Sequence, residues 1–408
     1  MMKKFGVLGE KLGHSFSPQI HGMLGDYEYS LIERQPDELD LLFESGEFDG
    51  FNVTIPYKKA VIPYMATLTD AARRCGSVNT VVKCADGTYL GDNTDYYGFF
   101  AMLRHSGISV EGKKVLVLGD GGVAPTVREV LKDALAGEIV TISRRGENNY
   151  ENIARHHDAA VIVNTTPVGM YPNGGKSPVR VADFTALEGV LDLIYNPVNT
   201  EFMLQAKELG IPAEGGLLML AAQAVKASER FLGCTYAEPE TSVRIYDELL
   251  RRQITVFLVG MPGCGKSTIG RALSEKCGRE FIDTDTEIAV SEGKSPAEII
   301  TERGVDEFRR IETEVLRAVS AKCGAVIATG GGIVTRPENL RLMKQNGVVV
   351  FLERSLEALA TEGRPLSAGG VEKLWQEREP LYRQFADGTY KVRGVEDTVN
   401  SLMKGLGL

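Results

Sequence analysis

Short apolar runs that stop at a glycine or a polar turn alternate along the chain with segments whose apolar residues recur at helical spacing. Runs of the first kind predict buried strands. Seven of them lie at Lys4–Leu8, Phe51–Ile55, Lys114–Leu118, Glu138–Ser143, 161–164, Gly189–Leu193 and Ile254–Val259. Two more lie within Arg279–Ile288, where the predicted strand ends in Asp283 and Asp285, and within Ala325–Val334. Segments of the second kind predict helices near Pro18, over Val127–Leu135, Glu201–Leu209 and Leu217–Leu232, after Ser267, and around Val305–Glu312. This alternation is typical of an α/β fold.

Length, charge and cysteine usage narrow the class of protein. A chain of 408 residues is too long for one core, so two or three domains are expected. The net charge of -9, without a basic block, argues against nucleic acid or an anionic membrane as a partner. The six cysteines form no C-x-x-C pair and have no metal-like spacing with the histidines, which predicts free thiols and a cytoplasmic location. We expect neither a signal peptide nor a membrane span, and a homo-oligomer is compatible with the sequence.

A phosphate-binding loop follows the strand at Ile254–Val259. Its residues Gly260, Gly263, Gly265, Lys266, Ser267 and Thr268 contain the pattern G-x-x-x-x-G-K-[ST]. The loop amides and the start of the next helix would form an anion nest, Lys266 would meet the β- and γ-phosphates, and Ser267 would hold magnesium. The alternative, a tight turn, is disfavoured by the strand before the loop and the helix after it.

A second glycine-rich turn follows the strand at Lys114–Leu118. Gly119, Gly121, Gly122 and Ala124 satisfy the dinucleotide-binding pattern G-x-G-x-x-[GA]. The next strand ends in Ser143, Arg144 and Arg145, where an NAD enzyme would carry an acidic residue. Two guanidinium groups there suit a 2′-phosphate, so NADP is favoured over NAD, the alternative being a solvated turn.

The first hundred residues hold three polar clusters. Ser15 and Ser17 precede the helix near Pro18 and suit a carboxylate, although by themselves they favour a simple N-cap. Lys58 lies on the bend beyond Pro56, where a lysine is usually solvated. Asn79 and the stretch Asp92–Asp95 are unusual choices for plain hairpin turns.

These clusters, HSFSP, NVTIPYK, GSVNT and GDNTD, occur in one order with NTTPVGMYPN, DLIYNP and GGLLMLAAQA. Together they resemble the shikimate dehydrogenase family over about the first 250 residues. The resemblance implies that Ser15 and Ser17 hold the substrate carboxylate, that Thr54 and Asn79 bind ring hydroxyls, that Lys58 and Asp95 are the catalytic pair, and that Gln223 is a further substrate contact. It also implies a substrate lobe at 1–100 plus 215–248, a Rossmann NADP lobe at 101–214, and a cleft that closes between them.

Reduction of a ketone requires a proton donor near the carbonyl oxygen, and either Lys58 or Asp95 could transfer that proton. The chain departs from the family at Asp120, which brings a negative charge near the pyrophosphate, and at Pro125 in the first helical turn. The family's Asn-Arg-Thr motif appears as Ser143, Arg144 and Arg145. These departures bear on cofactor affinity more than on cofactor type.

Beyond the phosphate loop, Asp283 and Asp285 are two positions apart on a predicted strand and would face the same side. Carboxylates beside a phosphate site favour a cation and a hydroxyl as partners, with a solvated turn as the alternative. Three consecutive glycines, Gly330–Gly332, would allow a small ligand to approach the backbone closely.

The series GMPGCGKST, DTD, EFRRIE, GGG, RPL and REPLYR resembles the shikimate kinase family over the rest of the chain. By this resemblance Asp285, Arg309, Gly331 and Arg378 hold shikimate, Asp283 lies near magnesium, and the lid residue Arg364 stabilises the transferring phosphoryl group. Asp285 would orient or deprotonate the attacking hydroxyl. The lid, Glu353–Leu366, is short and carries Ala360 and Thr361 where many members have another arginine.

The two resemblances imply a bifunctional enzyme of aromatic biosynthesis, with a modest linker at Cys234–Arg252 and a kinase domain at 253–408. It would reduce 3-dehydroshikimate with NADPH and phosphorylate shikimate with ATP and Mg²⁺. Two alternatives stand beside this interpretation: a quinate/shikimate dehydrogenase joined to another small-molecule kinase, and a metabolite-sensing regulator built from inactive copies of both modules.

Overall fold

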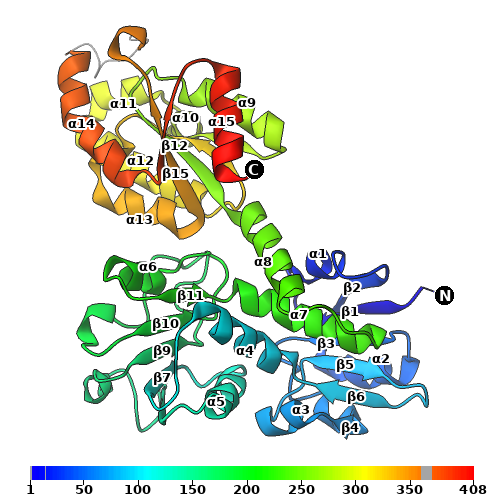
Figure 1. Cartoon of the computed structure of the whole chain (residues 1–408). Coiled ribbons are helices and arrows are strands. Elements are labelled where there is room, and N and C mark those ends of the chain that lie inside the picture. Colours follow the sequence, from blue (N-terminus) through cyan, green and yellow to red (C-terminus); the bar gives the residue numbers. More distant parts are fainter. Residues whose placement is uncertain (1, 14, 360–369) are drawn as a thin grey trace. The chain divides into compact units, whose positions relative to one another are not determined.

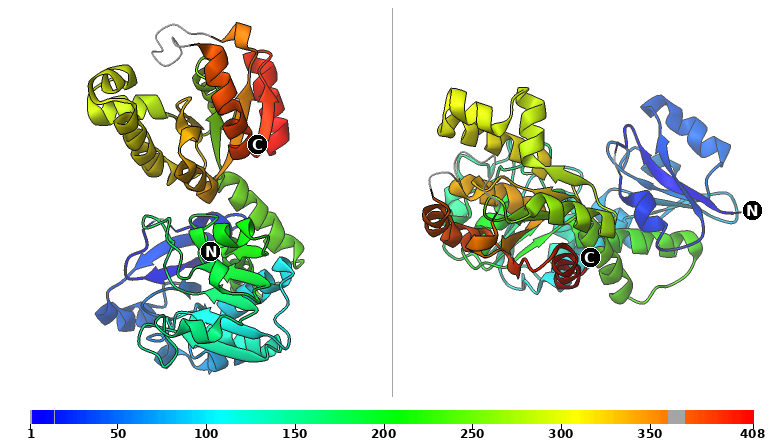
Figure 2. Two further views of the ribbon diagram at one scale, coloured as in Figure 1. Left: turned by 90° about the vertical axis from the view of Figure 1, so that its left-hand side faces the viewer. Right: turned by 90° about the horizontal axis from the view of Figure 1, so that it is seen from above.

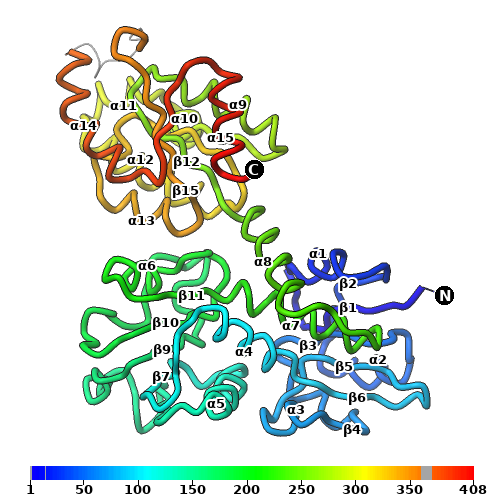
Figure 3. Tube along the Cα trace, viewed as in Figure 1, coloured from blue at the N-terminus to red at the C-terminus, as the bar shows by residue number. Residues whose placement is uncertain are grey.

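The computed structural model of the chain describes residues 2–13, 15–359 and 370–408. By its internal contacts the chain divides into two compact units. The N-terminal unit comprises Met1–Val168, Ser177–Tyr195 and Gln205–Glu248, and the C-terminal unit comprises Gly169–Lys176, Asn196–Leu204 and Leu249–Leu408. Figure 3 shows the path of the chain through each unit.

The first sheet of the N-terminal unit is mixed, with six strands in the order β2-β1-β3-β5-β6-β4. Its strands are β1 (Lys4–Gly9), β2 (Glu28–Glu33), β3 (Gly50–Val53), β4 (Thr67–Leu68), β5 (Thr80–Lys83) and β6 (Tyr89–Asp92). β1 is parallel to β2 and β3, whereas β5 is antiparallel to β3 and β6. The helices α1 (Ser17–His21), α2 (Leu39–Ser45) and α3 (Asp70–Cys75) belong to this lobe. The strand predicted at Phe51–Ile55 therefore begins one residue earlier and ends at Val53.

The second sheet of this unit is entirely parallel, in the order β11-β10-β9-β7-β8. Its strands are β7 (Lys114–Leu118), β8 (Glu138–Ile142), β9 (Val161–Asn164), β10 (Gly189–Asp192) and β11 (Ala213–Gly215), with helix α5 (Ala124–Asp133). The bound between the units falls within α6 (Glu201–Glu208), at Leu204. The predicted strands here are confirmed because continuous apolar runs are what a sheet buried on both faces requires. The strand order reverses between β7 and β9, and a ligand crevice forms at such a reversal.

Two helices, α4 (Thr94–Ser106) and α7 (Leu217–Leu232), run between the two sheets (Figure 1). They approach closely because Gly98 of α4 has no side chain: a Cβ there would lie 2.6 Å from the carbonyl oxygen of Met219. The predicted helix at Leu217–Leu232 is confirmed at both ends. A further helix, α8 (Glu240–Gln253), follows the loop after α7.

The C-terminal unit has a parallel sheet in the order β13-β14-β12-β15-β16. Its strands are β12 (Thr255–Val259), β13 (Phe281–Asp283), β14 (Val326–Ala328), β15 (Gly347–Glu353) and β16 (Gly388–Lys391). Helices cover both faces of this sheet (Figure 2): α9 (Lys266–Cys277), α10 (Thr284–Glu292), α11 (Pro296–Arg303), α12 (Val305–Ser320), α13 (Pro337–Asn346), α14 (Val371–Phe385) and α15 (Val395–Leu406). Within the described residues, no helix is both long and apolar enough to cross a membrane.

One prediction for this unit is wrong. The strand expected to carry both Asp283 and Asp285 ends at Asp283, and α10 begins at Thr284. The cause is local, because the Asp283 side chain accepts a hydrogen bond from the Asp285 amide at 3.0 Å and so caps the helix. Asp285 therefore lies in the first turn of a helix rather than beside Asp283 on one strand face.

Candidate active sites

A cavity of about 400 Å³ in the N-terminal unit gathers the predicted substrate residues. It is lined by Ser15, Ser17, Thr54, Lys58, Asn79, Asp95 and Gln223, together with Lys11, Asn52 and Tyr195. The residues come from the loop before α1, the end of β3, the loop before β5, the start of α4, and α7. The sequence motifs thus converge on one site although they lie far apart in the chain.

Lys58 and Asp95 form an ion pair at this cavity, with Lys58 Nζ 2.6 Å from Asp95 Oδ2. Both side chains are mostly buried, at 20% and 12% exposed. Asp95 lies in the first turn of α4, where the helix dipole favours a negative charge. The pair therefore presents an ammonium group, held by a carboxylate, to whatever occupies the cavity.

The three residues before Asp95 position the side chains of this site through hydrogen bonds. Asp92 accepts hydrogen bonds from Thr69 Oγ1 and Arg230 Nε, and Asn93 caps α4 by accepting from the Tyr96 amide. Thr94 donates its amide to Asn79 Oδ1 at 2.6 Å. Because this bond requires the oxygen of Asn79, its amide NH₂ group is the part of the side chain left to donate to a ligand.

Ser15 and Ser17 do not form the simple helix cap that their local sequence favours. The residue at the N-cap position of α1 is Phe16, which makes no side-chain capping bond, and Ser17 is the first helical residue. Ser15 Oγ accepts from the Ser17 amide at 3.2 Å. Both serines line the cavity, so they are placed to contact an occupant rather than to serve only the helix.

Sequence reasoning did not assign three polar lining residues. Asn52 links the cavity wall to the sheet, accepting from Tyr29 OH at 2.7 Å and donating to Thr80 Oγ1 at 3.0 Å. Tyr195 packs edge-on against Phe16, and burial raises the pKa of its phenol. Asn52 and Tyr195 belong to the NVT and IYNP motifs, so the signal was present. Lys11 carried no local signal.

The predicted dinucleotide residues meet at the carboxyl edge of the second sheet. Gly119 follows β7 with φ of +102°, and a Cβ there would lie 2.8 Å from Oγ1 of Thr165, which follows β9. Gly121 and Gly122 face open space, and Ala124 is fully buried where α5 begins. This arrangement fits a pyrophosphate held near the backbone at the N-terminus of α5.

Ser143, Arg144 and Arg145 follow β8 at the same edge. Ser143 is buried, whereas both arginines are exposed and form no ion pair within the described part of the chain. They are therefore available to a phosphate. Burial raises the pKa of the nearby Tyr150 phenol. The positive charge of Arg144 lowers that pKa, and the negative charge of Asp120 raises it. The departure at Asp120 thus brings a negative charge close to the arginine pair.

The C-terminal unit has a cavity of about 660 Å³ over the phosphate-binding loop. Gly260, Gly263 and Gly265 have φ of +149°, +84° and +103°, which side chains rarely adopt. Lys266 Nζ donates to the carbonyl oxygens of Gly260 and Met261 at 2.9 and 3.0 Å. Thr268 also lines the cavity. The loop thus matches a triphosphate cradle at the start of α9.

Ser267 Oγ donates to Asp283 Oδ2 at 2.6 Å, which brings the two predicted magnesium ligands together. Across residues 2–13, 15–359 and 370–408, no group of three histidine, cysteine or acidic side chains forms a metal cage. A hydroxyl and a carboxylate nevertheless fit Mg²⁺, which usually keeps several waters and is shared with substrate phosphates.

The far wall of this cavity is built by Gly330–Gly332 against charged side chains. Arg378 Nη1 donates to the Gly331 carbonyl at 3.0 Å, and a Cβ on Gly332 would lie 1.8 Å from Arg309 Nη2. Arg309 and Arg378 are each 7% exposed, and both line the cavity with Asp285. Two buried guanidinium groups on one small cavity suit a carboxylate.

Glu312 and Arg354 line this cavity too, and sequence reasoning missed both. Glu312 Oε2 accepts from Arg309 Nη1 at 2.6 Å, and burial raises the pKa of its carboxyl. The signal was the i, i+3 spacing in EFRRIE. The neighbouring Arg310 points elsewhere and pairs with Glu307 and Glu314 on the surface. The predicted lid residues Arg364, Ala360 and Thr361 lie outside the described residues.

Comparison with known proteins matches both units. The family model described as shikimate dehydrogenase substrate binding domain matches residues 7–81, and the model described as shikimate kinase matches residues 262–404. A protein of Clostridium perfringens (strain SM101 / Type A), named shikimate dehydrogenase (NADP(+)), is 37% identical over 269 residues, which cover 61% of this chain and 98% of the relative.

Solved structures agree with this match. The crystal structure of a chorismate mutase/shikimate 5-dehydrogenase fusion protein from Clostridium acetobutylicum has a TM-score of 0.58 at 34% identity, covering 61% of this chain and 97% of that one. Shikimate 5-dehydrogenase from Thermus thermophilus, solved in complex with NADP(H) and shikimate, has a TM-score of 0.54 at 28% identity, covering 60% of this chain and 99% of that one.

Proposed function

The chain belongs to the shikimate dehydrogenase family and carries a shikimate kinase domain behind it, and from this premise we propose that it is a bifunctional enzyme of the shikimate pathway. Its first reaction is the NADPH-dependent reduction of 3-dehydroshikimate to shikimate. Its second is the transfer of the γ-phosphoryl group of ATP to shikimate, giving shikimate 3-phosphate. The observation that carries the proposal is that the residues predicted to bind 3-dehydroshikimate line one cavity, while Asp285, Arg309, Gly331 and Arg378 line another over the phosphate-binding loop.

In the reduction, we assign the substrate carboxylate to the hydroxyls of Ser15 and Ser17, and the ring hydroxyls to Thr54, Asn79 and Gln223. NADPH, when bound, supplies the hydride. Lys58 donates a hydrogen bond to the carbonyl oxygen and stabilises the negative charge that develops there, and the Lys58–Asp95 pair delivers the proton that completes the new hydroxyl. Asp95 fixes the ammonium group of Lys58 at that oxygen.

NADP binding is assigned to the carboxyl edge of the second sheet. The turn from Gly119 through Gly121 and Gly122 to Ala124 would hold the pyrophosphate, and Ser143, Arg144 and Arg145 would hold the 2′-phosphate. Two exposed guanidinium groups support NADP over NAD. They also argue against the rival that uses NAD to oxidise quinate.

In the phosphoryl transfer, we assign the shikimate carboxylate to Arg309 and Arg378, with Gly331 shaping the wall behind them. Asp285 orients the attacking hydroxyl, while Lys266 and the loop amides around Gly263 stabilise the transferring phosphoryl group. Mg²⁺, held by Ser267 and Asp283, would offset phosphate charge when bound. Arg364 is proposed to add a further positive charge from the lid.

We propose boundaries of 1–100 plus 215–248 for the substrate lobe, 101–214 for the NADP lobe and 253–408 for the kinase domain. A cytoplasmic location is supported by the cysteines, because the six thiols are all free. An inactive metabolite sensor is disfavoured, since Lys58, Asp95, Lys266 and Asp285 are all present with suitable surroundings.

The test is to supply the full chain with 3-dehydroshikimate, NADPH, ATP and Mg²⁺ and to identify the product by mass spectrometry. We expect shikimate 3-phosphate, with shikimate as the product when ATP is omitted. Shikimate bound without turnover in either reaction would favour the sensor. Phosphorylation of another acceptor would favour the other rival, as would oxidation of quinate with NAD in preference to oxidation of shikimate with NADP when each is supplied in a separate assay.

A further inference from the structure

The N-terminal unit contains a second cavity, of about 510 Å³, that no part of the proposed mechanism uses. It lies between α4, α7 and the chain that runs from the end of α7 into α8. The same two helices line the substrate cavity with other residues, Asp95 from α4 and Gln223 from α7. Its volume is within the range of small-molecule binding sites, roughly 300–1,000 Å³.

The middle of this cavity is apolar, and its ends are polar. Phe100, Leu218, Ala222, Val225 and Val243 supply the apolar walls. At one end are Arg104 and His105, near the C-terminus of α4. The Arg104 side chain is exposed and makes no ion pair or hydrogen bond among the described residues. This end therefore offers a positive charge that no described protein group neutralises.

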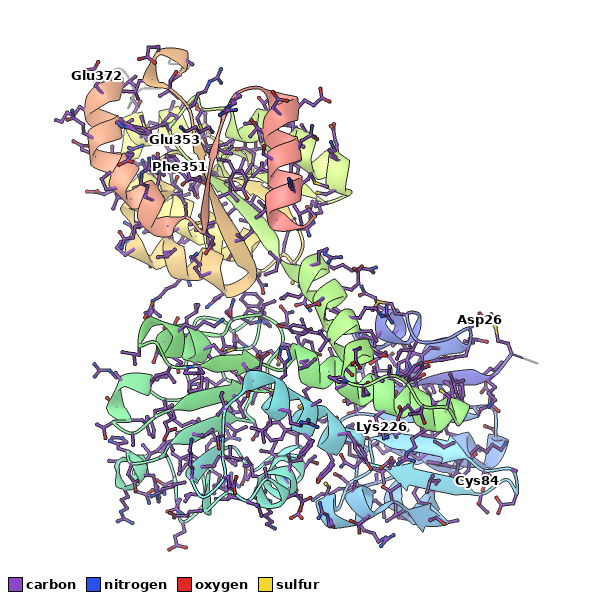
Figure 4. The ribbon with its side chains drawn as sticks, viewed as in Figure 1. Asp26, Cys84, Lys226, Phe351, Glu353 and Glu372 are labelled. Carbon is purple, nitrogen blue, oxygen red and sulfur yellow. The ribbon has the colours of Figure 1, made fainter. Side chains whose placement is uncertain are left out.

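The other end carries carboxylates. Lys226 (Figure 4) lies 5.0 Å from the centre of the Tyr97 ring and pairs with Glu229 at 2.7 Å. Glu229 also accepts from the Tyr236 amide, which uses its second oxygen. Glu238 differs, because among the described residues only its Oε1 is engaged, by Ser242 at 2.8 Å. Burial raises the pKa of Glu238, as expected of a carboxyl that lacks a direct cation partner.

Along α4, Tyr97, which packs on Lys226 at the carboxylate end, and Arg104 at the other end are seven residues apart. Seven residues at about 1.5 Å each give a separation of roughly 10 Å. A ligand that satisfies both ends must therefore carry an anion and a hydrogen-bond donor at opposite ends of an apolar body. A benzene ring with a short carboxylate tail and a para hydroxyl has this length and this polarity.

We propose that this cavity is a binding site for a small aromatic carboxylate. The carboxylate binds Arg104, the ring lies between Phe100, Leu218 and Val225, and a donor at the far end of the ring binds Glu238. Because α4 and α7 also carry Asp95 and Gln223, an occupant would contact the helices that frame the dehydrogenase site. The site itself does not depend on which reaction that cavity catalyses.

The probe is 3-(4-hydroxyphenyl)propionate, titrated into the full chain by isothermal calorimetry. Two analogues are matched controls: 3-phenylpropionate lacks the donor, and tyramine carries an amine where the carboxylate should be. We expect binding of the probe, binding about tenfold weaker for 3-phenylpropionate, and none for tyramine. No binding of the probe at millimolar concentration, or equal binding of tyramine, would overturn the proposal.

Three variants locate the site. Arg104→Gln should weaken binding of the probe at least tenfold. Arg317→Gln, which replaces an exposed arginine of α12, should leave the affinity for the probe unchanged. Ala101→Trp, from a half-buried position on the cavity wall, should abolish binding and leave the melting temperature and both reactions unchanged. Probe binding that survives Ala101→Trp would place the ligand elsewhere. A self-associated chain that excludes the probe in ultracentrifugation would show that a second copy covers the cavity, and it would likewise overturn the proposal.

Discussion

Arg230 of α7 donates from Nε to Oδ2 of Asp92 at the end of β6, with the two atoms 2.7 Å apart. The Asp92 side chain is 1% exposed, so its charge depends on this partner and on hydrogen bonds from Thr69 and Asn93. The pair joins α7, which carries Gln223, to the strand that leads into α4 and Asp95. Its position makes it a structural support for the dehydrogenase cavity rather than part of the chemistry.

Arg230→Met should therefore destabilise the N-terminal unit by about 3 kcal/mol, because it leaves a buried carboxylate without its cation. Urea denaturation followed by tyrosine fluorescence or circular dichroism should show the N-terminal transition moving to lower urea. Kinase activity in the absence of urea should be unchanged. Asp92→Asn combined with Arg230→Met should recover part of the loss, and an unchanged midpoint in the single variant would contradict the assigned role.

The two reactions should be separable by single substitutions. Lys58→Ala removes the hydrogen-bond donor at the ketone, so reduction should fall by roughly 10²–10⁴-fold while phosphorylation of added shikimate continues. Lys266→Ala should lower phosphorylation by at least about 10²-fold and spare reduction. Separate spectrophotometric assays measure each rate. Loss of both activities from either substitution in a still-folded chain would show that the modules are not independent.

The sequence predicted nine of the described strands, β1, β3, β7–β10 and β12–β14, and most of the site because these depend on local signals; it did not predict β2, β4, β5, β6, β11, β15 or β16. Buried parallel strands are continuous apolar runs, and the functional side chains cluster in short motifs at strand ends. What it missed depends on tertiary contacts. The N-cap bond from Asp283 turned Asp285 onto a helix, Glu312 became important through its contact with Arg309, and Ser17 was drawn to the cavity rather than to a cap.

Gly332 offers a test of the shikimate end of the kinase cavity. A Cβ at this position would overlap the guanidinium group of Arg309, at 1.8 Å from Nη2. Gly332→Ala should displace Arg309 and raise the KM for shikimate at least about tenfold, with a smaller effect on the KM for ATP. Gly394→Ala is the matched control, since that Cβ would meet no atom within 4 Å. If Gly332→Ala and Gly394→Ala had the same KM for shikimate, Arg309 would not belong to the shikimate site.

The arginine pair after β8 should determine cofactor choice. Replacing Arg144 and Arg145 together by alanine removes both guanidinium groups proposed for the 2′-phosphate, so the KM for NADPH should rise at least about tenfold and the KM for NADH should change little. Asp120→Ser should lower the KM for NADPH, because it removes a negative charge near the same phosphates. Parallel loss with both cofactors would indicate a structural role for the arginines.

His21 should make the N-terminal unit sensitive to acid. The ring is 1% exposed, stacks on Tyr29 with centroids 3.9 Å apart, and shares a 2.6 Å hydrogen bond between Nδ1 and the Tyr27 hydroxyl. Burial lowers the pKa of His21 from 6.5 to about 3. Between these values the unfolded chain binds a proton that the folded chain does not, so stability rises with pH across that window and is lost as the pH falls.

The loss should approach about 1.4 kcal/mol per pH unit below pH 6.5, before other groups are counted. Urea denaturation at about pH 7.5 and about pH 5.5, on either side of the histidine's ordinary pKa, measures it. His21→Phe keeps the stacked ring and has no titrating group. At the higher pH this variant should be less stable than the parent, because Tyr27 loses a hydrogen-bond partner. Its stability should nevertheless fall less steeply than that of the parent as the pH is lowered. The acid loss should be confined to the N-terminal transition, since the kinase unit has no described histidine. An identical slope in the parent and His21→Phe would show that His21 is not the group that titrates.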